Sequence, residues 1–169
     1  MPAPITPAYA LMPTPAEKIL TAWIRERPGA LAVKMLTPTT QEHLLVVLQQ
    51  ILSHPEEVNV DREDVWKVLA GADYLQFGTA TASGPARVEV VSRQAWTTSM
   101  TLGNAESPIK RVLVAIHSGL APALSLDELA QTLELVTKRV GNQAEIVFGH
   151  VYDVLLGESI RVMLLTSRH

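Results

Sequence analysis

Glycine spacing decides whether this chain could cradle a phosphate group. Loops that hold nucleotide phosphates through backbone N–H groups carry glycines about two to five residues apart. The glycines here are at positions 29, 71, 78, 84, 103, 119, 141, 149 and 157, and no two of them are closer than six residues. The sequence therefore contains neither a dinucleotide-binding fingerprint nor a Walker loop. Nucleotide chemistry would need a second chain, and we expect no bound nucleotide.

Histidines are the next residues that could do chemistry. His43 and His54 are eleven residues apart, which would place them on one helical face if the helix continued that far. Two histidines without a carboxylate partner make a poor zinc site, and the chain has no cysteine. His117 and His150 fall near the ends of expected strands, where a structural role is the better interpretation than that of a catalytic base. We therefore expect no metal, no other cofactor and no catalytic residue.

A short acidic segment contains Asn59, Asp61 and Asp64. A structural interpretation accounts for all three residues. Asp61 suits the N-cap of a following helix, Asp64 suits its first turn, and Asn59 suits a turn. A positioned carboxylate can also hold a water molecule by hydrogen bonds. The residues alone leave helix capping and contact with a partner both open.

Composition limits the classes of protein to which the chain can belong. Its 169 residues are 47% hydrophobic and 18% charged, which is enough to bury the core of one compact domain. The net charge of −3 gives no overall attraction to nucleic acid or to an anionic membrane. The longest apolar runs are far shorter than the roughly 20 residues that a membrane span needs. With no cysteine and no signal-peptide pattern, we expect a cytoplasmic protein.

The amino-terminal residues contain one well-marked helix. The first 13 residues hold four prolines and are interpreted as an extended arm. Thr14 and Glu17 form a capping box that predicts a helix over 15–27, and a weak strand is expected over 30–36. The helix carries an apolar stripe that includes Trp23. Such a stripe must be buried on its own domain or in a homodimer, and we favour a homo-oligomer.

The rest of the chain predicts an α/β (α+β) two-layer sandwich with these extra N-terminal helices. Helices are expected over 40–53, from 61 to Gly71, from 84 to 96 and over 126–140, and strands over 72–82, 111–117, 144–152 and 159–166. From 72 onward the order is strand-helix-strand-helix-strand-strand. We expect a mixed four-stranded sheet with two crossover helices on one face, the 40–53 helix on the other, and a terminal hairpin of the last two strands.

Several segments resemble one family in the right order. Residues 59–65 are similar to an N-x-D-x-x-D-V loop, and residues 77–84 to an M-G-x-G-x-A-S-G strand end with alanine for the second glycine. Further similar segments are V-L-V-A-I at 112–116, L-S-L-D-E at 124–128, I-V-F-G-H-V-Y-D at 146–153 and L-G-E at 156–158. Together these segments resemble the carboxy-terminal domain of FtsZ, the cell-division GTPase related to tubulin. The resemblance covers roughly residues 40–167.

This resemblance implies two parts, an arm and helix at 1–38 and an FtsZ C-terminal-like domain at 39–169. In the family, the loop matched by Asn59, Asp61 and Asp64 enters the nucleotide pocket of the next subunit, where its carboxylates orient the attacking water. A chain with that loop but no GTPase domain is expected to be a non-enzymatic interaction module. It would cap or modulate filaments of FtsZ or a similar protein. The alternatives are a self-associating α/β protein that binds a small ligand, and a scaffold unrelated to division.

Overall fold

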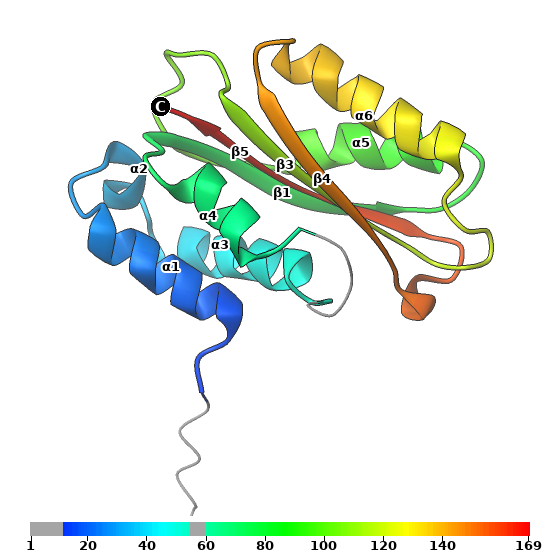
Figure 1. The fold of residues 1–169 in the computed structure, drawn as a ribbon, viewed down its shortest axis with the longest axis horizontal. Coiled ribbons are helices and arrows are strands. Elements are labelled where there is room, and N and C mark those ends of the chain that lie inside the picture. Colours follow the sequence, from blue (N-terminus) through cyan, green and yellow to red (C-terminus); the bar gives the residue numbers. More distant parts are fainter. Residues whose placement is uncertain (1–11, 55–59) are drawn as a thin grey trace, which may run out of the picture.

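The structure, a computed structural model, describes residues 12–54 and 60–169, and Figure 1 shows a twisted sheet with helices on both faces. The helices are α1 (Pro15–Glu26), α2 (Leu31–Lys34), α3 (Pro38–Ile51), α4 (Arg62–Leu69), α5 (Arg87–Thr97) and α6 (Leu126–Val140). The strands are β1 (Tyr74–Ala82), β2 (Met100–Gly103), β3 (Arg111–Ser118), β4 (Glu145–Tyr152) and β5 (Ile160–Arg168), and a 3₁₀ turn occupies Val154–Leu156.

The sheet has five strands in the order β2-β1-β5-β3-β4. Strand β1 pairs antiparallel with β2 and β5, and β3 pairs antiparallel with β5 and parallel with β4. The expected α/β class and mixed sheet are confirmed. Two expectations are wrong, because the sheet has a fifth strand and the last two strands do not form a hairpin.

The burial of β4 and β5 explains why they do not pair with each other. The run Val162–Leu165 is buried on both faces of the sheet, which suits β5 to the central position that it takes between β1 and β3. Strand β4 leaves Phe148 and Tyr152 half exposed, as an edge strand can. Strand β2 is only four residues long and buries only Leu102. It is therefore too short to show an alternation of apolar and polar residues in the sequence.

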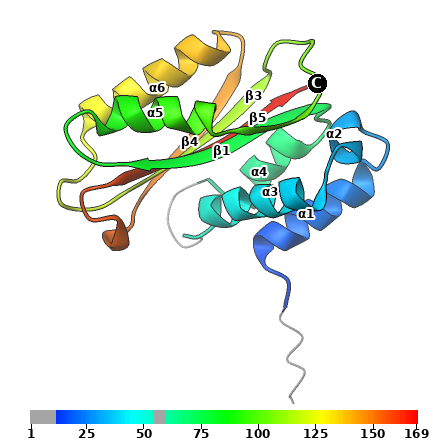
Figure 2. The ribbon, with the colours of Figure 1, turned by 180° about the vertical axis from the view of Figure 1, so that it is seen from behind.

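The helices cover the two faces in different groups. Figures 1 and 2 show α5 and α6 on one face and α1, α3 and α4 on the other. Leu48 of α3 is fully buried and Leu45 and Leu52 are partly buried in the core under β1, β3 and β5, which confirms the expected place of this helix. Within residues 12–54 and 60–169, no helix has the length and apolar content to cross a bilayer.

Helix α1 is part of the same core as the helices that follow it. Thr14 and Glu17 form the expected capping box. The stripe with Leu20 and Trp23 is buried against the chain's own α3 and α4, so it is not left for a second copy. The expected strand over 30–36 is wrong, because this segment forms the short helix α2. The expected boundary between residues 38 and 39 stays a prediction. The homo-oligomer also stays a prediction, and it would have to form through a surface other than the stripe of α1.

Gly78 marks a close approach of α5 to the sheet. A Cβ atom on Gly78 would lie 2.5 Å from the carbonyl oxygen of Ala95 and 2.9 Å from the Cα of Ser99. Backbone atoms cannot yield as a flexible side chain can. The carboxyl end of α5 therefore packs on β1 only because residue 78 has no side chain.

Candidate functional site

The acidic residues singled out in the sequence form the start of α4. The backbone N–H of Asp64 donates to Asp61 Oδ1 at 3.0 Å, and the backbone N–H of Asp61 donates to Asp64 Oδ2 at 3.1 Å. This reciprocal capping box explains why helix α4 begins here. Asn59 lies outside the described residues. Contact of Asn59, Asp61 or Asp64 with a partner stays a prediction.

The capping box leaves Asp61 exposed. Lys67 Nζ lies 3.7 Å from Glu63 Oε1 and 4.0 Å from Asp64 Oδ1, and its side chain is largely exposed, so these ion pairs contribute little. Arg111, at the start of β3, donates to the Lys67 carbonyl oxygen at 2.6 Å. The second half of α4 therefore lies beside the start of β3.

Three histidines, His54, His117 and His150, lie at the end of the sheet where β3 finishes. The ring of His54, just after α3, meets the ring of His117 edge to face at 5.0 Å between centroids. Burial, and to a lesser degree the charge of His54, lowers the pKa of His117 from 6.5 to about 4. His43 is exposed on α3 and does not join His54 on one face, since α3 ends at Ile51. Within the part of the chain described, no group of three His, Asp or Glu side chains is placed to hold a metal ion.

A serine and a histidine meet at the same end. Ser118 Oγ and His150 Nε2 are 2.7 Å apart, and the ring of His150 meets Tyr152 edge to face at 4.8 Å. Ser118 is fully buried, so no substrate could reach its hydroxyl, and we interpret the pair as structural. Sequence alone does not show this pair, because the contact depends on the parallel register that aligns β3 with β4.

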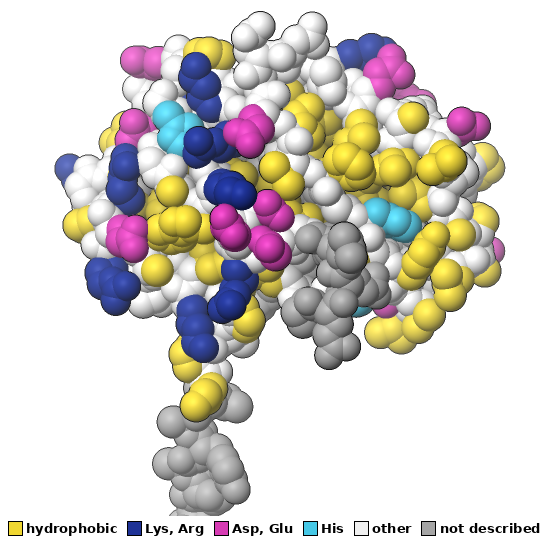
Figure 3. Space-filling model, viewed as in Figure 1, with side chains coloured by type: hydrophobic (Ala, Val, Ile, Leu, Met, Phe, Trp, Pro, Cys, Tyr) yellow, Lys and Arg dark blue, Asp and Glu magenta, His cyan; other side chains and the backbone are white. Residues whose placement is uncertain are grey.

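Exposed apolar side chains continue from this end of the sheet. Val154 and Leu155, in the turn after β4, are 70% and 91% exposed, and Leu120 and Tyr152 beside them are also exposed. Figure 3 shows hydrophobic side chains gathered over β4 and the turn that follows it. We call Leu120, Tyr152, Val154 and Leu155 the end surface. Exposed apolar side chains that gather in this way mark interaction sites in soluble proteins.

A buried arginine holds the loops of the end surface in place. Arg87, 2% exposed, donates through Nε and one terminal nitrogen to both carboxylate oxygens of Glu128, at 2.7 and 2.8 Å. Its remaining N–H groups donate to the carbonyl oxygens of Pro122, Ala123 and Glu158 at 2.9 to 3.1 Å. All five donors are thus used. The guanidinium also lowers the pKa of the Glu128 carboxyl from 4.5 to about 2.

Comparison with known proteins agrees with this fold. Residues 73–167 match the family described as "FtsZ family, C-terminal domain", a match that begins after Asp61 and Asp64. The cell division protein FtsZ of Buchnera aphidicola is 29% identical over 120 residues, which are 71% of this chain and 31% of that protein. FtsZ of Porphyromonas gingivalis is 28% identical over 110 residues, 65% of this chain and 24% of that protein. The chain thus spans less than a third of these relatives.

Solved structures show the same fold. A point mutant of FtsZ from M. jannaschii aligns with a TM-score of 0.60 and 19% identity over 86% of this chain and 44% of that one. CetZ2 from Haloferax volcanii, solved as a GTPγS-bound protofilament, aligns with a TM-score of 0.51 and 19% identity over 75% of this chain and 38% of that one. The family match covers more than half of the sequence and the fold agrees with it. The chain therefore belongs to the FtsZ family, through its C-terminal domain.

Proposed function

We propose that this chain is a non-enzymatic interaction module that binds a subunit of an FtsZ-type filament through its end surface and caps or modulates the filament. One observation carries the proposal. The chain combines an FtsZ C-terminal fold with exposed apolar side chains at the end of its sheet, and no segment of its sequence has the glycine spacing of a phosphate loop.

The chemistry of the end surface supports docking on a protein. Leu155, Val154 and Leu120 offer apolar area that a partner could remove from water, at about 25 cal/mol per Å². Glu158, two residues after the turn at Val154–Leu156, is exposed and adds a carboxylate at its margin. An apolar centre with charged groups at its margin is the usual composition of a protein interface.

The proposed effect follows from what the sequence lacks. Two of the relatives are cell division proteins, and one solved relative is a GTPγS-bound protofilament. A module bound at a filament end would present no nucleotide to the next subunit, so growth at that end would stop. Asp61 and Asp64 would at most add carboxylates to the partner's GTPase site. The purified chain should neither bind nor hydrolyse GTP, and micromolar affinity for GTP would overturn this part of the proposal.

The test mixes the full chain with FtsZ from the same organism and follows filament length by electron microscopy together with GTP turnover. Substoichiometric protein should shorten filaments. Asp61→Ala and Asp64→Ala should then alter GTP turnover at the capped contact, whereas Glu63→Ala, a neighbouring exposed carboxylate outside the capping box, should not. If the two aspartates only cap α4, their substitution would cost about 0.5 to 2 kcal/mol of stability and leave the partner effect intact.

The alternative is a self-associating protein that binds a small ligand and has no link to filaments. The same mixing experiment distinguishes it. Unchanged filament length and GTP turnover at equimolar protein, together with a dimeric mass by light scattering, would replace the capping proposal with this alternative.

A further inference from the structure

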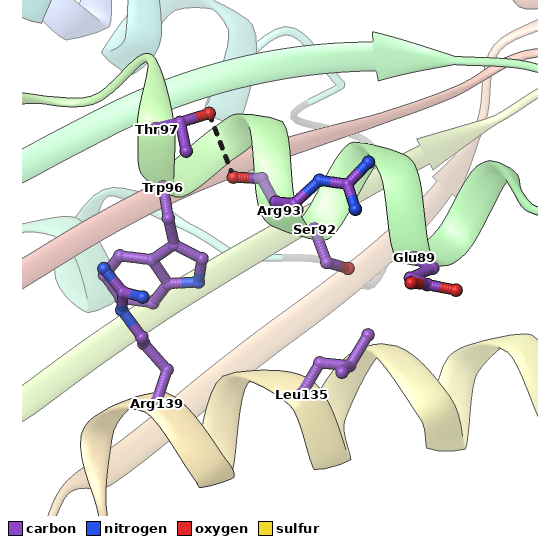
Figure 4. Close-up of a pocket in the computed structure, with 7 residues that line it drawn as sticks. All are labelled: Glu89, Ser92, Arg93, Trp96, Thr97, Leu135 and Arg139. Carbon is purple, nitrogen blue, oxygen red and sulfur yellow. Dashed lines mark hydrogen bonds between the residues drawn. The ribbon is translucent and has the colours of Figure 1, made fainter.

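A pocket of about 270 Å³ lies between α5 and α6, on the face of the sheet opposite α4. Figure 4 shows its lining, which consists of Glu89, Ser92, Arg93, Trp96, Thr97, Leu135 and Arg139. Its volume falls just below the roughly 300 to 1,000 Å³ of ordinary ligand sites, so a ligand here would be small. The end surface and its proposed partner use none of these residues.

The first sign of a ligand is a buried hydroxyl group without a partner. Ser92 is 4% exposed, and its Oγ has no hydrogen-bond partner among the described residues. In Figure 4 this hydroxyl points from α5 toward α6, where Leu135 approaches from the other side. A buried polar group that makes no hydrogen bond is destabilising, and native proteins seldom leave one. A polar atom of a bound molecule would satisfy it.

The second sign is a pair of arginines without carboxylate partners. Arg93 and Arg139 are both exposed at the rim of the pocket, and neither forms an ion pair with a described residue, although Glu89 lines the same pocket. The guanidinium of Arg139 lies over the Trp96 ring, 5.4 Å from the ring centroid. Stacking engages the flat face of the guanidinium and leaves its N–H edge available, which is the edge that binds a carboxylate through two hydrogen bonds.

We propose that this pocket binds a small aromatic carboxylate. Its carboxylate pairs with the N–H edge of Arg139, and its ring lies against Trp96 and Leu135. A hydroxyl or similar polar substituent at the far end of the ring bonds to Ser92 Oγ. Three features of different chemistry thus meet within one small cavity: a held cation, an apolar wall and an unsatisfied hydroxyl.

The test titrates the full chain with 6-hydroxy-2-naphthoate and follows amide and indole resonances by NMR. The expected dissociation constant is about 1 mM or tighter for a ligand of this size. Resonances of Ser92, Trp96, Leu135 and Arg139 should shift together and saturate. The neutral probe 6-hydroxy-2-naphthamide should bind at least about tenfold more weakly, because it has no charge for Arg139 to pair with.

Two variants separate the contacts. Arg139→Gln should weaken 6-hydroxy-2-naphthoate binding about tenfold or more, and the exposed arginine variant Arg25→Gln, on α1 at the other face, should leave it unchanged. Ser92→Ala, which removes a hydroxyl that makes no bond in the protein, should fold normally. It should weaken the hydroxylated probe several-fold and leave 2-naphthoate unaffected.

The proposal is wrong if the pocket resonances do not shift at millimolar probe. It is equally wrong if the carboxamide binds as well as the carboxylate, or if Arg139→Gln binds like the wild type. If Ser92→Ala weakens the binding of 6-hydroxy-2-naphthoate and of 2-naphthoate equally, Ser92 has a packing role and does not recognise the hydroxyl group of the ligand.

Discussion

Arg87 offers a quantitative test of how the end surface is held. Replacement by methionine keeps much of the aliphatic stem and removes all five N–H donors. The carbonyl oxygens of Pro122, Ala123 and Glu158 then lose their partner, and Glu128 loses the cation beside it. These carbonyls belong to the loops on either side of the end surface, so we expect the loops to loosen as well as the protein to lose stability.

The size of the effect follows from burial. Arg87 is almost completely buried, and breaking a buried ion pair by removing one partner costs about 3 to 5 kcal/mol, because the other charge is left uncompensated. For a chain of this length, that loss lowers the midpoint of thermal unfolding by roughly 6 to 20 °C. The double variant Arg87→Met/Glu128→Gln should lose less stability than the two single variants lose in sum. The second substitution removes the charge of Glu128 that the first leaves uncompensated.

Urea denaturation of the wild type, the single variants and the double variant measures these free energies of unfolding. Lys138→Met is the matched control, since it breaks the exposed Lys138–Glu134 ion pair and should cost less than about 1 kcal/mol. A loss below about 1 kcal/mol for Arg87→Met, or full additivity in the double variant, would refute the assigned role of Arg87.

Two further predictions concern pH and packing. The folded-state pKa of His117 is lowered to about 4, so as the pH falls below 6.5 the unfolded chain takes up this proton first and stability drops by up to about 3 kcal/mol by pH 4. Urea titrations at several pH values from 7 to 4 measure this loss, and in His117→Leu the free energy of unfolding should fall less with pH. The same fall in the variant as in the wild type would show that His117 is not its source. Gly78→Ala should destabilise by about 1 to 3 kcal/mol, because its Cβ would collide with the Ala95 carbonyl. Ala80→Ser, further along β1, is the control, and an alanine variant as stable as the wild type would contradict the close approach.

The helices could be predicted because their signals are local. The capping boxes at Thr14, Asp61 and Ser125 are all present in the structure and begin α1, α4 and α6. Helix α3 begins at Pro38 and is capped by Thr37, two residues before the expected start at residue 40. A helix cap is formed by residues about three positions apart in the chain, so it can be predicted from the sequence alone.

The features that sequence alone does not show depend on residues far apart in the chain. The central place of β5 is set by pairing with β1 and β3, and the edge strand β2 is too short to show a pattern. From the sequence, Arg87 would be expected to be an exposed cation near the start of a helix. Its carbonyl partners belong to loops 35 to 71 residues away along the chain. The end surface likewise appears only when the turn after β4 is placed beside the end of β3.

The most direct measurement of the central claim is binding of the full chain to FtsZ from the same organism, with Leu155→Asp as the test variant. Leu155 is the most exposed residue of the end surface, and Leu31→Asp places the same charge on an exposed leucine of α2, at the other end of the molecule. In co-sedimentation with filaments, the wild type and Leu31→Asp should bind alike, and Leu155→Asp should bind at least about tenfold more weakly. Equal binding by all three proteins, or none by the wild type at equimolar concentration, would contradict docking through the end surface.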